Sequence, residues 1–575
     1  MNTRKIQALF CALFIAMSFI ACKKSETILQ DGIFVGAGEG KDGPITVSIT
    51  ITGGKVTDAE IISDSENPEI SDVAKRRIMQ LFKTSGTTKN IDAISGATLT
   101  SRGLIEALDA ALISATGKKS KKQVYTDTKC DIAIIGAGGA GLIAATEAAS
   151  KGAHVIVLEK MGIVGGNSNF STGGINAAYT KEQERLGITD DKETFYDDTM
   201  KGGYYMNDPA LVHTLVNNSK DIVEWLQSPL IGADLSDVGI FGGATNKRIH
   251  RPKGGAAIGA HLIPLLHKAA LAQGAEIRLN NKVIDILKEE NKAIGVRVVT
   301  AEGEYIILAK AIIIATGGFG ANAEMVAMYQ PALAGFGTTN HRGATGDAFA
   351  MVEKFDAELS NMTQIQTHST VVPGSNIMIT EAVRGNGAIL VNVAGNRFVN
   401  EMETRDVVSA EILKQKDKCA FLVFDQNVRE SLKAIDDYYR QGLLTQGNTL
   451  AELAEKIHVP ISGLTKTIET YNTFVLSGVD SDFHRNARSM DCTLTKAPFY
   501  AVKCIPAIHY TMGGLKINTK AQVMNKSHKA IPGLYAAGEV TGGVHGGARL
   551  GGNAVADYCV FGKIAADSAL QYIGM

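Results

Sequence analysis

The chain has 575 residues, of which 45% are hydrophobic and 20% charged, and its formal net charge is -1. This length predicts two or three domains, and the near-neutral charge argues against nucleic-acid binding, which needs an excess of Lys and Arg. The chain has 61 glycines but only 12 prolines and no period of three, which excludes collagen and indicates close backbone approach to a ligand. Its seven cysteines show neither metal-ligand spacing nor a C-x-x-C-H motif, so we expect no metal and no covalent haem.

Residues 1–22 have the pattern of a signal peptide. Arg4 and Lys5 precede an apolar run that is too short for a membrane span. The residues before Cys22 are similar to a lipobox, apart from Phe19 where Leu is usual, so lipidation of Cys22 is expected. Simple cleavage after a small residue is the alternative. Both outcomes predict an extracytoplasmic protein, either a cell-membrane lipoprotein or periplasmic, with no transmembrane helix in the mature chain.

Residues 31–115 form a small predicted domain. Residues 46–51 alternate between polar and apolar, as a half-buried strand does. The glycines at 53–54 allow a turn, after which residues 56–62 can return as the partner strand.

Two helices and a linker follow. Helices are expected at 72–83 and at 103–114, the second with an apolar face. Residues 116–130 include a basic stretch without apolar residues, which predicts a linker; a solvated helix end is the alternative. Both interpretations place a domain boundary here.

The large unit begins with a βαβ pattern. The apolar stretch 132–135 is followed by six small residues at 136–141, a helical stretch at 142–150 and a second apolar stretch at 154–158 that ends in Glu159. The glycines let the backbone approach a pyrophosphate at the helix N-terminus, and the Glu159 carboxylate can accept hydrogen bonds from ribose hydroxyls. We therefore predict a dinucleotide site; a glycine-rich structural turn is the alternative.

Further glycine clusters favour FAD over NAD. Residues 165–167 and 172–176 follow Glu159 closely and can pass near an isoalloxazine ring. An apolar strand at 312–314 runs into Thr-Gly-Gly, and residues 533–539 repeat the order of strand, glycine and acid. These returning strands predict that the FAD-binding fold closes only at the C-terminus, with a second domain inserted within it.

Five ordered blocks point to one family: 380–387, 396–401, 404–406, 509–514 and 538–554. With them, the chain from Ile132 onward resembles the flavoprotein part of soluble fumarate reductases of the flavocytochrome c type. More distantly, it is similar to succinate dehydrogenase flavoproteins and L-aspartate oxidases. The resemblance implies an α/β fold (mixed α+β), in which a Rossmann-like FAD-binding domain carries an inserted clamp, or capping, domain. The expected boundaries are 131–361 and 507–575 for the two FAD-binding parts and 362–506 for the clamp.

Residues 92–98 read Asp-Ala-Ile-Ser-Gly-Ala-Thr and resemble the motif of covalent FMN-binding domains. In that family the matching Thr bears FMN through a phosphoester bond, so Thr98 is the expected attachment site and a separate flavin transferase is implied. A helix-capping Thr in an ordinary glycine turn is the alternative. Haem-bearing relatives receive electrons through an N-terminal cytochrome, a role that FMN would take here.

The glycine pattern and the resemblance together assign noncovalent FAD to a set of residues spread over the large unit. This set is Gly136, Gly138, Ala140, Gly141, Glu159, Asn167, Thr172, Gly173, Gly174, Val283, Asp347, Glu539 and Ala554. No metal ligands are assigned.

The resemblance also implies a site for two carboxylates. One carboxylate lies on His509 and Arg549, and the other on His368 and Thr380. Arginine forks and His or Thr donors hold carboxylates well and stabilise charge that develops when the C=C bond takes hydride from FAD N5. Met378 matches a position that packs under the substrate; plain core packing is its alternative.

The proton donor that the resemblance implies is Arg405. Arginine has a reference pKa above 12, but a weak acid can protonate a strongly basic centre if it is well positioned and quickly reprotonated. Glu381 and Arg384 match the family's proton relay to solvent. Their spacing of three residues places them on one face of a helical turn, for which a surface ion pair is the alternative.

These residues predict an FAD-dependent reductase that converts fumarate to succinate, with a membrane quinol or flavoprotein as the expected electron donor. Alternatives are reduction of urocanate, an acrylate or a cinnamate, oxidation of succinate or aspartate, and a non-catalytic electron carrier. Retention of both His368 and Thr380 favours a dicarboxylate. The set of Arg405, His509 and Arg549 argues against a mere carrier. The sequence leaves the electron donor, the oligomeric state and the physiological direction open.

Overall fold

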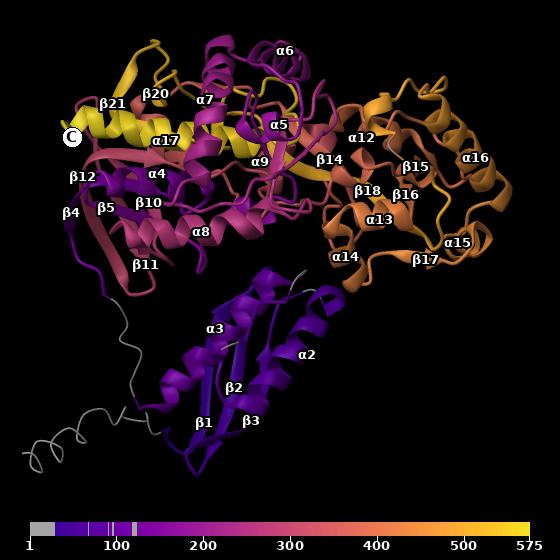
Figure 1. Ribbon diagram of the computed structural model, residues 1–575. Helices are drawn as coiled ribbons and strands as arrows, with labels where there is room; N and C mark the ends of the chain where they lie inside the picture. The colour runs from indigo at the N-terminus through magenta and orange to yellow at the C-terminus, as the bar shows by residue number, and fades with distance from the viewer. Residues whose placement is uncertain (1–28, 67, 90, 95–96, 118–123, 491) are drawn as a thin grey trace, which may run out of the picture. The chain divides into compact units, whose positions relative to one another are not determined.

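The computed structural model describes residues 29–66, 68–89, 91–94, 97–117, 124–490 and 492–575. The chain divides into two units, Met1–Lys122 and Gln123–Met575 (Figure 1). The predicted signal peptide with Cys22, the Ser-Gly pair of the FMN motif and the basic part of the linker lie outside the described residues. Within the described ranges, no helix combines the length and the apolar character that crossing a bilayer requires.

The first unit is a three-stranded antiparallel sheet with two helices. The sheet has the order β1 (Gly32–Glu39), β2 (Pro44–Thr52) and β3 (Lys55–Ser63), and the helices are α2 (Pro68–Ser85) and α3 (Thr98–Ala115). Its core combines alternate residues of β2 with the inner faces of both helices. The predicted hairpin and both helices are confirmed, although α3 begins five residues before its predicted start.

Strand β1 was not predicted, and its glycines explain both its sequence and its place. A Cβ added to Gly36 would lie 2.1 Å from the carbonyl oxygen of Ala107 in α3. The bare backbone of β1 therefore lets α3 pack directly against it. A strand selected for close helix contact carries few of the β-branched residues that identify strands in a sequence.

A mixed eight-stranded sheet forms the centre of the second unit. Its parallel strands are β9 (Glu276–Arg278), β5 (Val155–Leu158), β4 (Thr128–Ile135), β12 (Gly303–Ile314) and β21 (Ala530–Ala536), and β10 (Lys282–Glu289), β11 (Lys292–Thr300) and β20 (Gln522–Met524) complete it. The inner strands are continuous apolar runs, as expected for parallel strands that are covered on both faces. Because β21 pairs in parallel with β12, the sheet closes only near the C-terminus, as predicted.

Helices α4 (Gly139–Ser150) and α17 (Asn553–Ile573) pack side by side against this sheet (Figure 1). The other helices of this part are α5 (Lys181–Arg185), α6 (Lys192–Gly202), α7 (Pro209–Gln227), α8 (Ile258–Ala272), α9 (Ala323–Tyr329) and α10 (Asp347–Val352). Two small sheets accompany them: β6 (Ile175–Asn176), β8 (Ile249–Arg251) and β7 (Asp237–Gly239), and β13 (Leu359–Ser360), β19 (Gly514–Lys516) and β22 (Thr541–Gly542).

A second sheet with its own hydrophobic core lies within the same unit. Its strands are β14 (Ile365–Val371), β18 (Phe499–Thr511), β16 (Ala420–Asp425), β15 (Ile389–Val391) and β17 (Thr445–Gly447). Its helices are α11 (Ala382–Gly385), α12 (Arg405–Lys414), α13 (Gln426–Ser431), α14 (Lys433–Arg440), α15 (Leu450–Lys456) and α16 (Ile461–Ser477). The long strand β18 spans both cores, because Val502 packs in the second core and Ile508 in the first.

Candidate active site

The loop between β4 and α4 forms a glycine-lined cradle. Gly136 has a φ of 104°, and a Cβ there would lie 2.4 Å from the carbonyl oxygen of Ala315. Gly138 is open instead, since the nearest atom to an added Cβ would be 3.9 Å away. At the end of β5, Glu159 accepts a hydrogen bond from the Ala137 N–H at 2.9 Å. Bare backbone, a helix N-terminus and an acid at the next strand fit the pyrophosphate and ribose of a dinucleotide.

The next predicted FAD residues surround this cradle. Ala140 and Gly141 lie in the first turn of α4, and a Cβ on Gly141 would lie 1.9 Å from the carbonyl oxygen of Gly136. Residues 172–174 lead into β6 and pass so close to β8 that a Cβ on Gly174 would lie 2.2 Å from a carbonyl oxygen. The chain thus has glycine at the points where side chains would block close backbone packing.

Asn167 and Glu539 come from distant glycine clusters and meet in the structure. The Asn167 amide donates to Glu539 Oε2 at 3.3 Å, and the Thr511 N–H donates to Glu539 Oε1 at 3.0 Å. Burial raises the pKa of Glu539. This contact connects the N-terminal glycine cluster with the end of β18, where the predicted substrate residues begin.

The remaining predicted FAD residues have less distinctive surroundings. Asp347 begins α10 and pairs at 3.1 Å with Lys160, the residue that directly follows Glu159. Val283 is buried in β10, and Ala554 is the second residue of α17. The structure places Asp347 near the cradle, whereas Val283 is a strand residue of the sheet itself.

Thr98 is the first residue of α3 and is partly exposed. This helix has 18 residues and no acidic side chain in its first turn. The partial positive charge at such an N-terminus favours a phosphate group. The surroundings of Thr98 therefore fit an FMN phosphoester, although part of the motif lies outside the described residues.

Two histidines from paired strands face each other in the second unit. The rings of His368 on β14 and His509 on β18 have centroids 5.1 Å apart. His368 Nδ1 accepts the Thr370 N–H at 3.3 Å, so its proton lies on Nε2, which has no hydrogen-bond partner in the described part of the chain. Thr339 Oγ1 lies 2.7 Å from His509 Nδ1. Burial and the cationic Arg405 lower the pKa of both histidines well below the usual range, which keeps both rings neutral.

Glu381 binds two of the predicted arginines. Arg405 Nε donates to Glu381 Oε1 at 2.7 Å and its Nη2 donates to Oε2 at 3.2 Å, which is a bidentate pair. Arg384 Nη2 also donates to Oε1, at 3.3 Å. Only 4% of the Glu381 side chain and 2% of the Arg384 side chain are exposed. The alternative of a surface ion pair is therefore wrong: the contact follows the predicted spacing, but it is buried.

Arg549 contributes a third guanidinium. Its Nη1 donates to the Leu550 carbonyl at 3.1 Å, its carbon Cζ lies 4.6 Å from the Tyr510 ring centroid, and its Nε has no partner among the residues described. Burial and Arg405 lower its pKa to about 9. Burial alone would raise the pKa of Glu381, but the three arginines lower it to about 2. Three guanidinium groups thus surround Glu381, and Glu539 also acts on Arg549, so the arginines keep an excess of positive charge.

Thr380 and Met378 precede Glu381 in the chain. Thr380 is 2% exposed, and its N–H donates to the hydroxyl of Tyr438 at 3.1 Å. Met378 is only partly buried and forms a bridge with Val371 of β14. Of the predicted substrate residues, Met378 is therefore the one that the contacts connect least firmly to the histidine and arginine cluster.

Gln366 belongs to the same cluster and was not predicted. Its Oε1 accepts from Arg405 Nη1 at 3.1 Å, and its Nε2 donates to the Arg549 carbonyl at 2.8 Å. It therefore links two of the three arginines. Gln366 lies two residues before His368 on one strand, and this period of two was the signal that could have identified it.

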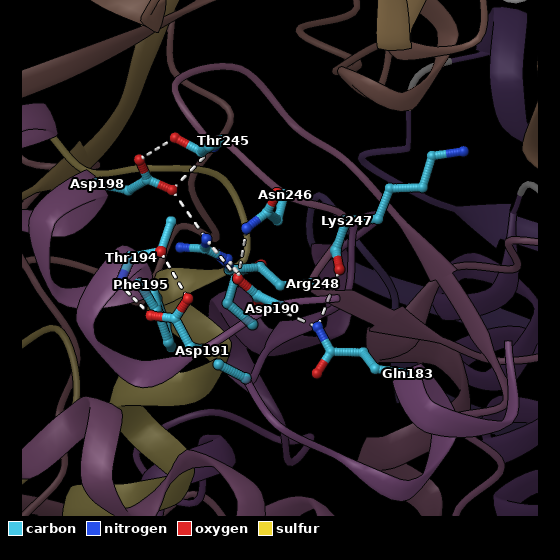
Figure 2. Close-up of polar contacts among 12 residues, drawn as sticks. Gln183, Asp190, Asp191, Thr194, Phe195, Asp198, Thr245, Asn246, Lys247 and Arg248 are labelled. Carbon is cyan, nitrogen blue, oxygen red and sulfur yellow. Dashed lines mark hydrogen bonds and ion pairs between the residues drawn. The ribbon is translucent and has the colours of Figure 1, made fainter. Parts of the chain in front are cut away.

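The loop that precedes β8 packs against a segment that lies beside Glu381. A Cβ on Gly551 would lie 2.4 Å from a ring carbon of Phe241, so the two segments are in close contact. At the end of this loop, Arg248 is 1% exposed and pairs with Asp190 at 3.0 Å and Asp198 at 2.9 Å (Figure 2). Breaking a buried pair by removing one partner costs about 3–5 kcal/mol, so this cluster holds the loop firmly.

Two known protein families match the chain. Residues 131–555 match the family described as FAD binding domain, and residues 40–113 match the FMN-binding domain. These matches confirm the predicted architecture and the two predicted cofactors, FAD and FMN.

Similar proteins of known activity extend over most of the chain. The fumarate reductase (cytochrome) of Shewanella frigidimarina is 46% identical over 444 residues, which is 77% of this chain and 77% of the relative. The urocanate reductase of Eggerthella lenta is 33% identical and covers 93% of this chain and 92% of its own length. The solved open conformation of a flavocytochrome c3 fumarate reductase has a TM-score of 0.65 and 41% identity, covering 80% of this chain and 84% of that chain.

Proposed function

The chain belongs to the FAD-dependent flavoproteins of the fumarate reductase family, and from that premise we propose that it reduces fumarate to succinate. The observation that carries the proposal is the charge of the buried cluster. Arg384, Arg405 and Arg549 surround Glu381, and Glu539 acts on Arg549 from the side of the predicted FAD site, which leaves an excess of positive charge. A dicarboxylate supplies negative charge to such a site, and charged groups are tolerated in a protein interior only when paired.

The free donor atoms support the same substrate. His368 Nε2 and Arg549 Nε are buried without a partner among the described residues, and an unsatisfied buried donor is costly. We assign one carboxylate to His509 and Arg549 and the other to His368 and Thr380. The histidines are neutral, so they contribute hydrogen bonds while the arginines contribute charge.

Arg405 is our candidate for the proton donor. When bound, FAD supplies the hydride, and the carbon on the other side of the double bond then requires a proton. The bidentate contact with Glu381 orients the Arg405 guanidinium and offers a route for its reprotonation. Arg384 is the next group along this route, because it shares Glu381 Oε1 with Arg405. Its burial means that any exchange with solvent passes through further groups.

The finer organisation of the protein also forms part of this proposal. The second core supports a capping domain at 362–506, whose residues enclose the substrate together with those of the FAD-binding parts. Electrons enter through FMN bound covalently to Thr98 by a separate flavin transferase, and a membrane quinol or flavoprotein reduces this FMN. The leader sequence supports an extracytoplasmic site of action, with Cys22 as the lipidated residue.

The main competing substrate is urocanate, because the relative from Eggerthella lenta has this activity by name. Urocanate has a single carboxylate, so it would fill only one of the two carboxylate positions that we assign to the site. The two sets of donor groups therefore favour fumarate, whereas overall similarity alone does not separate the two acids.

A comparison of substrates tests the proposal. The purified protein, loaded with FAD and supplied with a reduced dye, is given fumarate, urocanate or cinnamate at matched concentrations. We expect kcat/KM for fumarate to exceed both other values at least tenfold. If urocanate or cinnamate is reduced tenfold faster than fumarate, the proposal fails, and the protein is a reductase of that acid.

A further inference from the structure

Tyr438 lies directly behind the proposed substrate site. It belongs to α14, its ring packs in the second hydrophobic core, and it is 5% exposed. Its hydroxyl accepts the Thr380 N–H at 3.1 Å, and the side chain of Thr172 lies nearby. Burial raises the pKa of this phenol, so it stays protonated at neutral pH and can accept one hydrogen bond while donating another. This hydroxyl thus binds a proposed substrate residue and lies close to a residue of the predicted FAD site.

The segment that Tyr438 contacts needs external support. Thr380 and Glu381 precede α11, which is only four residues long and too short to be stable by itself. On one side, the segment is held by the Ile379 N–H, which donates to the Thr370 carbonyl of β14. On the other side, Tyr438 is the acceptor for the buried Thr380 N–H. Without this hydroxyl the N–H would be buried and unsatisfied, and the segment would have to shift to find another partner.

We propose that Tyr438 is a positioning residue for the second-carboxylate subsite of this enzyme, acting through Thr380. This inference rests on the proposed function and deepens it, because it assigns the dicarboxylate preference to the Tyr438–Thr380 contact. Tyr438 does not contact the substrate itself. It fixes the backbone from which the Thr380 hydroxyl reaches the carboxylate.

Two neighbouring tyrosines provide a matched test. Tyr438→Phe removes the hydroxyl and keeps the ring, whereas Tyr439→Phe makes the same change on a residue that is 40% exposed and stacks on Arg429. In the FAD-loaded full chain with a reduced dye, we expect Y438F to raise KM for fumarate about tenfold while kcat stays within about threefold. Y439F should match the wild type in both constants.

A second measurement separates positioning from general structural support. Thr380→Val keeps the backbone N–H but removes the hydroxyl that binds substrate. If Tyr438 acts through Thr380, adding Y438F to T380V should raise KM less than twofold further, whereas independent effects would multiply. The inhibition constant of succinate should rise in parallel with KM in Y438F, and that of the monocarboxylate crotonate should not.

The outcomes divide clearly. A Y438F protein with the wild-type KM for fumarate, or one whose effect multiplies with that of T380V, overturns the positioning role while leaving the proposed function intact. Loss of FAD or of the folded state in Y438F also overturns it, because Tyr438 would then support the fold as a whole. Failure of the wild-type chain to reduce fumarate overturns the proposed function and is measured without any variant.

Discussion

Replacing Glu381 by Gln tests the electrostatic account of the site most severely. The substitution keeps the shape of the side chain and removes the single negative charge shared by the buried arginines. The pKa of Glu381 lies at about 2 instead of the ordinary 4.5. Each pKa unit corresponds to about 1.4 kcal/mol. Ionisation of this carboxylate therefore stabilises the folded protein relative to the unfolded chain by about 3 kcal/mol. The cost of removing one partner from a buried ion pair is of similar size.

The pH dependence of this effect has a definite sign. Because the folded-state pKa is lowered, the stabilisation is fully present above about pH 4.5 and is lost as the pH falls toward 2. At pH 7, E381Q should therefore melt several degrees below the wild type, and the difference should shrink steadily below pH 4.5. Succinate should stabilise E381Q more than the wild type, because it supplies the missing negative charge.

The kinetic expectation is a separation of kcat from KM. Loss of the reprotonation route should lower kcat by about 10²- to 10⁴-fold, while KM for fumarate should not rise, because the site becomes more positive. Glu430→Gln is the control: this carboxylate is exposed and pairs with Lys496, so its loss should change little. If E381Q melts at the same temperature as the wild type and its kcat stays within threefold of the wild-type value, the reasoning is refuted.

The same residues can be tested by three further substitutions and by the pH dependence of KM. Arg405→Ala should abolish dye-driven turnover while the flavin absorbance shows that FAD stays bound; near-normal turnover would remove the acid assignment. Gly136→Ala should lower the FAD content of the purified protein, because φ is 104° and an added Cβ would collide with a carbonyl oxygen; full FAD occupancy would contradict the cradle. Thr98→Ala should eliminate flavin fluorescence on a denaturing gel and donor-driven activity, but not dye-driven reduction. KM for fumarate should stay flat from pH 6 to 8, because His368 and His509 are neutral in that range; a rise in KM across pH 6.5 would indicate a titrating histidine.

Local patterns explain which parts of the fold could be predicted. The hairpin of β2 and β3, and the order of strand, glycine loop, helix and acid that ends at Glu159, are both encoded within about 30 residues. Strand β1 was missed because Gly36 serves its contact with α3, not the ordinary preference of a strand. Period and turn residues identify elements well, whereas they do not show which element will pack closely on another.

The site was predictable only in part for a similar reason. The spacing of Glu381 and Arg384 indicates contact, but it does not show that both side chains are buried, which is what lowers the pKa of Glu381. Tyr438 lies on the apolar face of α14, so its place in the sequence indicates only a core residue. The Thr380 N–H that donates to its hydroxyl lies in another segment, and no local pattern shows this contact. The Arg248 cluster likewise unites side chains from separate segments, and no sequence spacing encodes such contacts.

The central claim is that this buried cluster binds and reduces a dicarboxylate, and a single-turnover experiment tests it most directly. FAD in the purified protein is reduced without oxygen, one equivalent of fumarate is added, and the flavin absorbance and the products are followed together. We expect the flavin to be reoxidised and one succinate to form for each FAD. Flavin that stays reduced with fumarate, but is reoxidised by urocanate or cinnamate, would contradict it.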